Sequence, residues 1–101
     1  MESNFSISTG QLIRKLRLER NLPLRKIAAQ LDMDTSFLSK IERSNRRPSK
    51  DHIIKLAQIF EVDRDYLMIP YLSELVYFEV STEDCAAKAL EIATQRINLN
   101  K

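Results

Sequence analysis

A short polar surface around residues 35–40 has side chains suited to reading the edges of DNA bases. Thr35 and Ser36 begin this segment, Phe37 follows them, and Lys40 lies one helical turn later on the same face. Thr and Ser hydroxyls hydrogen-bond several base edges, Lys donates to guanine, and an aromatic ring contacts the thymine methyl group. The same spacing is typical of the solvated face of an ordinary three-helix core, so spacing alone leaves both interpretations open.

Charge is distributed unevenly along the chain, although the formal net charge of its 101 residues is only +2. Residues 14–50 contain eleven Lys or Arg and four Asp or Glu, whereas residues 51–101 contain five and nine. A basic segment beside an acidic one indicates a half that binds a polyanion and a half with another role. An ordinary solvated surface of uneven composition would give the same counts.

The composition argues against an enzyme, and we expect no catalytic residue, metal or cofactor. His52, Cys85 and Gly10 are the single representatives of their residue types. Metal sites built from His and Cys, and glycine-rich phosphate loops, need more of these residues than the chain has.

The length of the chain fits one domain with a short arm. No apolar stretch is long enough to span a bilayer, and no secretion signal is visible. A lone cysteine excludes an internal disulfide, which indicates a reducing, cytoplasmic setting.

Hydrophobic periodicity predicts helices that position the polar surface. Leu38 and Ile41 lie on the opposite face from Lys40 and would hold this helix to a core. The expected N-caps are Thr9, Asp34, Ser49 and Asp63. Five helices are expected, over residues 11–21, 23–31 and 35–43, after Ser49, and from about Asp63 through Leu67.

The segment beyond Pro70 has a mixed pattern. Residues 71–80 are rich in aromatic and β-branched residues, which favours a strand, but their apolar residues also fall at helical spacing. We slightly favour a helix, with Pro70 in its first turn. Ser81 and Asp84 form an approximate capping box and predict a last helix over residues 82–98.

Residues 22–67 resemble the lambda-repressor-like helix-turn-helix family, also called Cro-type or XRE. The resemblance is carried by Ile27-Ala28, Leu31, the string SFLSKIER at residues 36–43, Arg47-Pro48-Ser49 and Leu56-Ala57. With the first helix it covers about residues 10–68. The family implies an all-α fold, with a five-helix DNA-binding domain at residues 8–68 and the helix-turn-helix motif itself at about 24–43.

The resemblance also implies roles for individual residues. Thr35, Ser36 and Lys40 match the base-reading positions of the family, with Phe37 beside them. Leu24 stands where the family often has a Gln that contacts phosphate, so only backbone N–H groups are left there to bind phosphate. The other phosphate contacts fall to residues beside the third helix, namely Arg43, Asn45, Arg46, Arg47 and Lys50.

Two further features are implied by the same resemblance. Arg17 and Glu42 match a structural ion pair between the first and third helices of the family. Asp32 and Ser44 stand where the family often has glycine, and Asn45 follows Ser44. Because Asp and Asn tolerate the left-handed backbone conformation better than most residues, we expect both turns to form at a modest cost.

Residues 69–101 form a C-terminal arm outside the DNA-reading module, with more apolar surface than a short arm can bury alone. We expect residues 71–97 to form a homodimer interface, with folding back onto the first and fifth helices as the alternative. The leading hypothesis is a repressor or controller of transcription that reads the major groove of a two-fold symmetric operator with helix 35–43. An antitoxin or protein-interaction module, whose arm binds a partner protein, is the second hypothesis.

Overall fold

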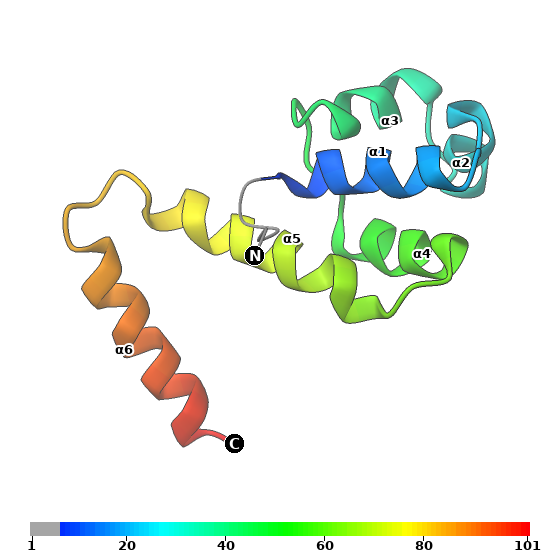
Figure 1. Cartoon of the computed structure of the whole chain (residues 1–101). Helices are drawn as coiled ribbons and strands as arrows, with labels where there is room; N and C mark the ends of the chain where they lie inside the picture. Colours follow the sequence, from blue (N-terminus) through cyan, green and yellow to red (C-terminus); the bar gives the residue numbers. More distant parts are fainter. Residues whose placement is uncertain (1–6) are drawn as a thin grey trace.

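Six α-helices make up the part of the chain that the computed structural model describes, residues 7–101 (Figure 1). The predicted all-α fold is confirmed, because no strand occurs among these residues. None of these helices is both long and apolar enough to cross a membrane. The helices are α1 (Thr9–Glu19), α2 (Leu24–Gln30), α3 (Thr35–Glu42), α4 (Lys50–Phe60), α5 (Arg64–Val80) and α6 (Ala86–Leu99).

Helices α1 to α5 enclose one hydrophobic core. The central helix is α1, because it packs against α3, α4 and α5, while α2 packs on α3. Figure 1 shows α2 and α3 on one side of α1, and α4 and α5 on the other. The largest fully buried apolar side chains are Phe60, Leu12, Ile13, Ile27, Leu38, Ile41, Ile53, Leu56 and Leu67. This core fixes α3 by one face and leaves its other face exposed.

Serine capping boxes begin α1 and α4. The Ser8 hydroxyl accepts from the Gln11 N–H at 3.1 Å, and the Gln11 side chain accepts from the Ser8 N–H at 2.8 Å. The predicted Thr9 cap is therefore wrong, because Ser8 makes this box and Thr9 lies in the first turn of the helix. At α4, Ser49 is the N-cap as predicted, and His52 completes the box.

Non-glycine residues in the left-handed backbone conformation close four of the turns between helices. Asp32 (φ 57°) and Ser44 (φ 66°) occupy the two turns in which the family often has glycine, so both turns form without it. The N–H groups of Met33 and Asn45 close these turns by donating to carbonyl oxygens of the preceding helices at 3.0 and 2.9 Å. The other residues in this conformation are Asn21 and Glu61.

Helix α5 runs unbroken through residue 80 and differs from the sequence prediction in two respects. The short helix expected to end at Leu67 and the segment 71–80 are one element, and the strand alternative for residues 71–80 is wrong. Pro70 lies inside this helix, where its missing N–H removes one backbone hydrogen bond. Burial of Leu67 and Tyr71 on either side of it offsets this loss. The domain boundary expected between residues 68 and 69 consequently falls within a helix.

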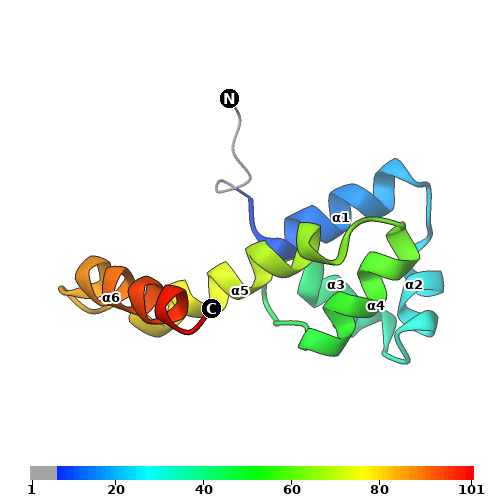
Figure 2. The same cartoon turned by 90° about the horizontal axis from the view of Figure 1, so that it is seen from below.

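Helix α6 begins later than predicted, at Ala86 instead of residue 82. The predicted capping box of Ser81 and Asp84 is wrong, because α5 extends to Val80 and takes Ser81 as its own C-cap in the right-handed helical region. The N-cap position of α6 is Cys85, whose side chain makes no capping hydrogen bond. No residue of α6 is buried, and both views show the helix projecting away from the body (Figures 1 and 2).

Gly10 lies where α1 passes close to the end of α3. A Cβ atom added there would overlap the Ile41 carbonyl oxygen and lie 3.1 Å from the Glu42 carbonyl oxygen. We expect Gly10→Ala to lower the free energy of unfolding by about 1–3 kcal/mol, because backbone rather than a flexible side chain has to move. Urea denaturation measures this loss. Lys15→Ala, at an exposed position of the same helix, is the control, and equal stability of the two variants would contradict the close approach.

Candidate nucleic-acid interface

The outer face of α3 presents most of the residues predicted to read bases. Thr35, Ser36 and Lys40 are exposed, whereas Leu38 and Ile41 on the opposite face are buried. The helix is therefore held by its apolar face and offers hydroxyl and ammonium groups outward. These groups can donate and accept hydrogen bonds at base edges in the major groove.

The start of α3 differs in detail from the predicted arrangement. Phe37 is half-buried and packs against the core, so only part of its ring faces outward. Asp34 stands at the N-cap position as expected, but its side chain makes no capping hydrogen bond, and the same holds for Asp63 at α5. These two capping bonds were predicted and are absent from the described part of the chain.

At the start of α2, the Leu24 side chain is half-buried and packs against the core. Pro23 occupies the N-cap position and makes no side-chain capping hydrogen bond. The side chain of Leu24 thus serves packing, and backbone N–H groups are the polar groups that the first turn offers.

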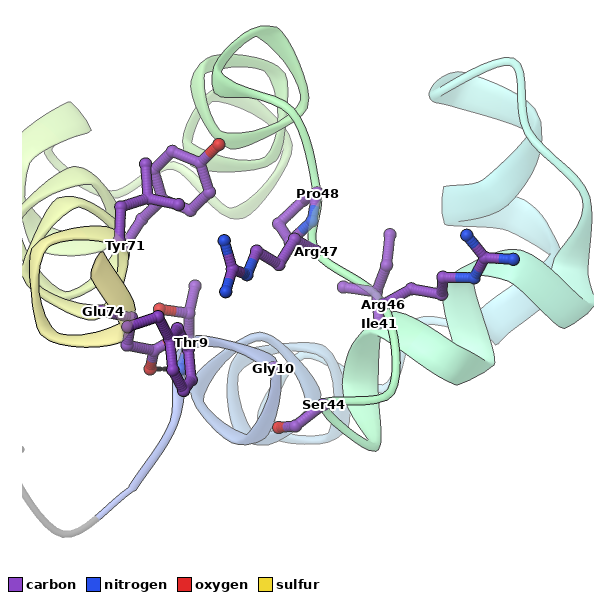
Figure 3. Close-up of a pocket in the computed structure, with 11 residues that line it drawn as sticks. Thr9, Gly10, Ile41, Ser44, Arg46, Arg47, Pro48, Tyr71 and Glu74 are labelled. Atoms are coloured by element: carbon purple, nitrogen blue, oxygen red, sulfur yellow. Dashed lines mark hydrogen bonds between the residues drawn. The ribbon is translucent and has the colours of Figure 1, made fainter. Parts of the chain in front are cut away.

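Two consecutive arginines, Arg46 and Arg47, lie in the segment that joins α3 to α4, and their side chains have different surroundings. Figure 3 shows the Arg46 and Arg47 side chains pointing in opposite directions, with Arg46 on the α3 side and Arg47 toward α5. The central carbon of the Arg47 guanidinium lies 4.5 Å from the centroid of the Phe78 ring, which is a cation–π contact. All the predicted phosphate ligands of this region are exposed, namely Arg43, Asn45, Arg46, Arg47 and Lys50.

A cavity of about 70 Å³ separates Arg47 from the start of α1 (Figure 3). The Glu74 carboxylate of α5 accepts a hydrogen bond from the Thr9 N–H at 2.6 Å, which occupies the positive end of α1. The Thr9 hydroxyl is buried without a hydrogen-bond partner. A volume of this size holds about two water molecules, so this region is a junction between helices rather than a ligand pocket.

Sequence reasoning missed the two α5 residues at this junction, Glu74 and Phe78. Glu74 is 65 residues from the backbone group that it caps, so no local pattern in the sequence relates them. The sequence places Phe78 only within the predicted interface segment, residues 71–97, with nothing to relate it to Arg47. Its ring stays half exposed even with Arg47 over it.

Arg17 and Glu42 form a buried ion pair that joins α1 to α3. Arg17 Nε and Nη2 donate to the two Glu42 carboxylate oxygens at 2.7 and 3.1 Å, a bidentate geometry. Arg17 Nη1 also donates to the Leu22 carbonyl oxygen at 3.1 Å. The pair lies under α3 rather than on its outer face, so its effect on α3 is to fix the position of the helix.

Comparison with known proteins identifies the family. Residues 13–67, more than half of the chain, match the model of a helix-turn-helix family. Control protein C.BamHI of Bacillus amyloliquefaciens is 33% identical over 63 residues, which are 61% of this chain and 78% of that protein. The HTH-type transcriptional regulator ImmR of Bacillus subtilis (strain 168) is 29% identical over 62 residues, 61% of this chain but only 49% of ImmR. The chain therefore belongs to the XRE-type, lambda-repressor-like helix-turn-helix family of DNA-binding transcriptional regulators.

Proposed function

We propose that the protein is a sequence-specific transcriptional regulator, a repressor or controller, that reads the major groove of double-stranded DNA with α3. One observation carries this proposal: Leu38 and Ile41 fix one face of α3 to the core while Thr35, Ser36 and Lys40 are exposed on the other. A recognition helix needs this arrangement, because its first turn must reach base edges while its opposite face stays anchored.

Contacts to the DNA backbone are assigned to the exposed residues that flank α3. We propose Arg43, Arg46 and Lys50 as cationic phosphate ligands and Asn45 as a neutral donor, with the backbone at Leu24 on the α2 side. Arg47 is also exposed, but its guanidinium lies over the Phe78 ring and its side chain points away from that of Arg46. It therefore contributes to DNA binding less directly than its neighbour Arg46.

The names of the relatives support a role in regulation. One is a control protein and the other a transcriptional regulator, and neither name denotes an enzyme. We accordingly propose that this chain acts as a regulator and not as an enzyme. This chain covers 78% of the length of C.BamHI. Whether the protein is a controller or a repressor depends on the genes that its operator regulates.

We further propose that the protein binds a two-fold symmetric operator as a homodimer through the arm, residues 71–97. The inner face of α5 is occupied by its own domain, which leaves the outer face of α5 and all of α6 for the partner. A different protein bound to the arm is the second candidate, and the same exposed α6 favours it. Light scattering of the purified chain distinguishes them, since a dimer mass supports self-association and a monomer mass supports another partner.

Selection of bound sequences from a random pool of DNA duplexes tests the proposed function. Two inverted half-sites about one helical turn apart are expected, because two-fold symmetric dimers of this kind place their recognition helices in successive major grooves. An unenriched pool would contradict sequence-specific binding. Enrichment of a single half-site would support sequence-specific binding but contradict the symmetric dimer.

Lys40→Ala is expected to weaken binding to the selected operator by about 1–3 kcal/mol and to relax base preference at one position of each half-site. The reason is that an exposed ammonium on α3 is placed to donate to guanine. Competition binding against operators with single base changes measures both effects. Lys55→Ala, which removes an equal charge from an exposed position of α4, is the matched control. Unchanged preference in Lys40→Ala would exclude this residue from base reading.

A further inference from the structure

The outer side of α5 carries an exposed apolar stripe. Ile69, Leu72 and Val76 follow one another at i, i+3 and i+7, the spacing of residues along one side of a helix. Of their surfaces, 64%, 42% and 47% are exposed. Leu67 and Tyr71 are buried on the side that faces the core, so α5 is apolar on two sides and only one of them is covered. We refer to Ile69, Leu72 and Val76 as the α5 stripe.

Helix α6 carries a second uncovered apolar face, lined mainly by small residues. None of its residues is buried. The turn after α5 directs α6 away from the body, so α6 does not lie along the α5 stripe of its own chain (Figures 1 and 2). An isolated helix of 14 residues is marginally stable in water, so α6 needs a packing partner. The apolar face consists of Ala86, Ala89, Leu90, Ala93 and Ile97.

Side-chain size on the two faces, and the net charge of the two helices, favour contact between α5 and α6. The large side chains of the α5 stripe suit a face lined by alanines, because large and small residues interdigitate across a helix contact. Helix α5 contains three acidic residues and one basic residue, whereas α6 contains two basic residues and one acidic residue. Opposite charge favours contact between α5 and α6, while two α5 helices side by side bring like charges together.

We infer that a second copy of this chain covers both faces, with α6 of each copy packed across the α5 stripe of the other. This inference rests on the homodimer proposed above and specifies how the arm forms it. A two-fold axis makes the contact occur twice, and both apolar faces of each chain are then covered. The assembly closes at two copies, because no further α5 stripe is left for another α6.

Introducing opposite charges on the two faces gives a direct test with the whole 101-residue chain. Leu72→Glu alters only the α5 stripe, and Leu90→Lys alters only the α6 face, and both positions are exposed in the chain. In a homodimer of either variant both contacts carry an unpaired charge, so the dissociation constant is expected to rise at least about 30-fold. Sedimentation equilibrium measures this constant.

An equimolar mixture of the two variants is expected to recover dimers. A mixed dimer has one unaltered α5–α6 contact, and its other contact joins the introduced carboxylate to the introduced ammonium. Leu18→Glu, which alters an exposed leucine of α1, is the control and should leave the dimer unchanged. Circular dichroism of each variant verifies that the helices remain folded.

Several outcomes would overturn the inference that α6 of each copy packs across the α5 stripe of the other. They are a monomeric parent chain, a single variant that dimerises like the parent, and a mixture no more dimeric than the separate variants. The last two results would point to contacts between like helices. A chain that dimerises as inferred but selects no DNA sequence would instead count against the proposed function, so the two failures are distinguishable.

Discussion

Replacing Arg17 with alanine is expected to lower the free energy of unfolding by about 3–5 kcal/mol, the cost of removing one partner from a buried ion pair. Only 3% of the Glu42 side chain is exposed, so its carboxylate would be left charged and unpaired in the core. The Leu22 carbonyl would also lose the donor that Arg17 supplies. Urea denaturation followed by circular dichroism measures the change.

A double variant separates the effect of the unpaired Glu42 charge on stability from the effect of lost packing. Arg17→Met combined with Glu42→Leu removes both charges and keeps apolar volume, so it should recover most of the stability that Arg17→Ala loses. A loss below about 1 kcal/mol in Arg17→Ala would instead place the pair among solvent-screened surface pairs. Because the pair joins α1 to α3, the destabilised variant should also bind operator DNA less well at temperatures near its unfolding midpoint.

Affinity for operator DNA is expected to fall by about 10³-fold when the salt concentration rises from about 50 to 200 mM. Each subunit of the proposed dimer would neutralise phosphates with Arg43, Arg46 and Lys50, and the counterions released on binding make the affinity depend on salt. Fluorescence anisotropy with a labelled duplex gives the slope of log affinity against log salt. A slope near zero would contradict binding through phosphates.

Arg46 and Arg47 provide a matched pair for this measurement, since they are adjacent and have the same charge. Arg46→Ala should reduce the slope by about 0.9 for each subunit, as expected for one lost phosphate contact. Arg47→Ala should leave the slope nearly unchanged, because Arg47 lies over Phe78 and faces α5. An equal reduction of the slope in both variants would mean that Arg47 contacts a phosphate when DNA binds, as predicted from the sequence.

The sequence predicted the first four helices because their determinants are local. Apolar spacing identified the buried faces of these helices, and Ser49 marked the start of α4. The same local reasoning failed for α5. Pro70 usually ends or begins a helix, but here Leu67 and Tyr71 pack into the core on either side of it and keep the helix continuous. Tertiary burial outweighed a local preference, and a local pattern does not reveal that burial.

The candidate site was predictable to a similar extent. The exposed side of α3 follows from which of its residues are apolar, so the exposure of Thr35, Ser36 and Lys40 was predictable from spacing, while their base-reading role came from the family resemblance. The position of Arg47 was not predictable, because its ring partner lies in another helix and the two meet only in the folded chain. The misplaced cap at Thr9 is a smaller error of one residue, since Ser8 and Thr9 are both suitable capping residues and only the Gln11 side chain distinguishes them.

The anchoring of α5 at Glu74 and Phe78 has a consequence for how two half-sites would be bound together. A flexible linker lets a second DNA-binding domain sample many distances, and its effective concentration at any one half-site is then modest. Here the element that joins domain to arm is a helix without a break, attached to the domain by a hydrogen bond and a cation–π contact. In the proposed dimer the second domain would be presented at nearly one distance and one rotation. Avidity would then be high for a single half-site spacing and would fall sharply when one base pair is added or removed.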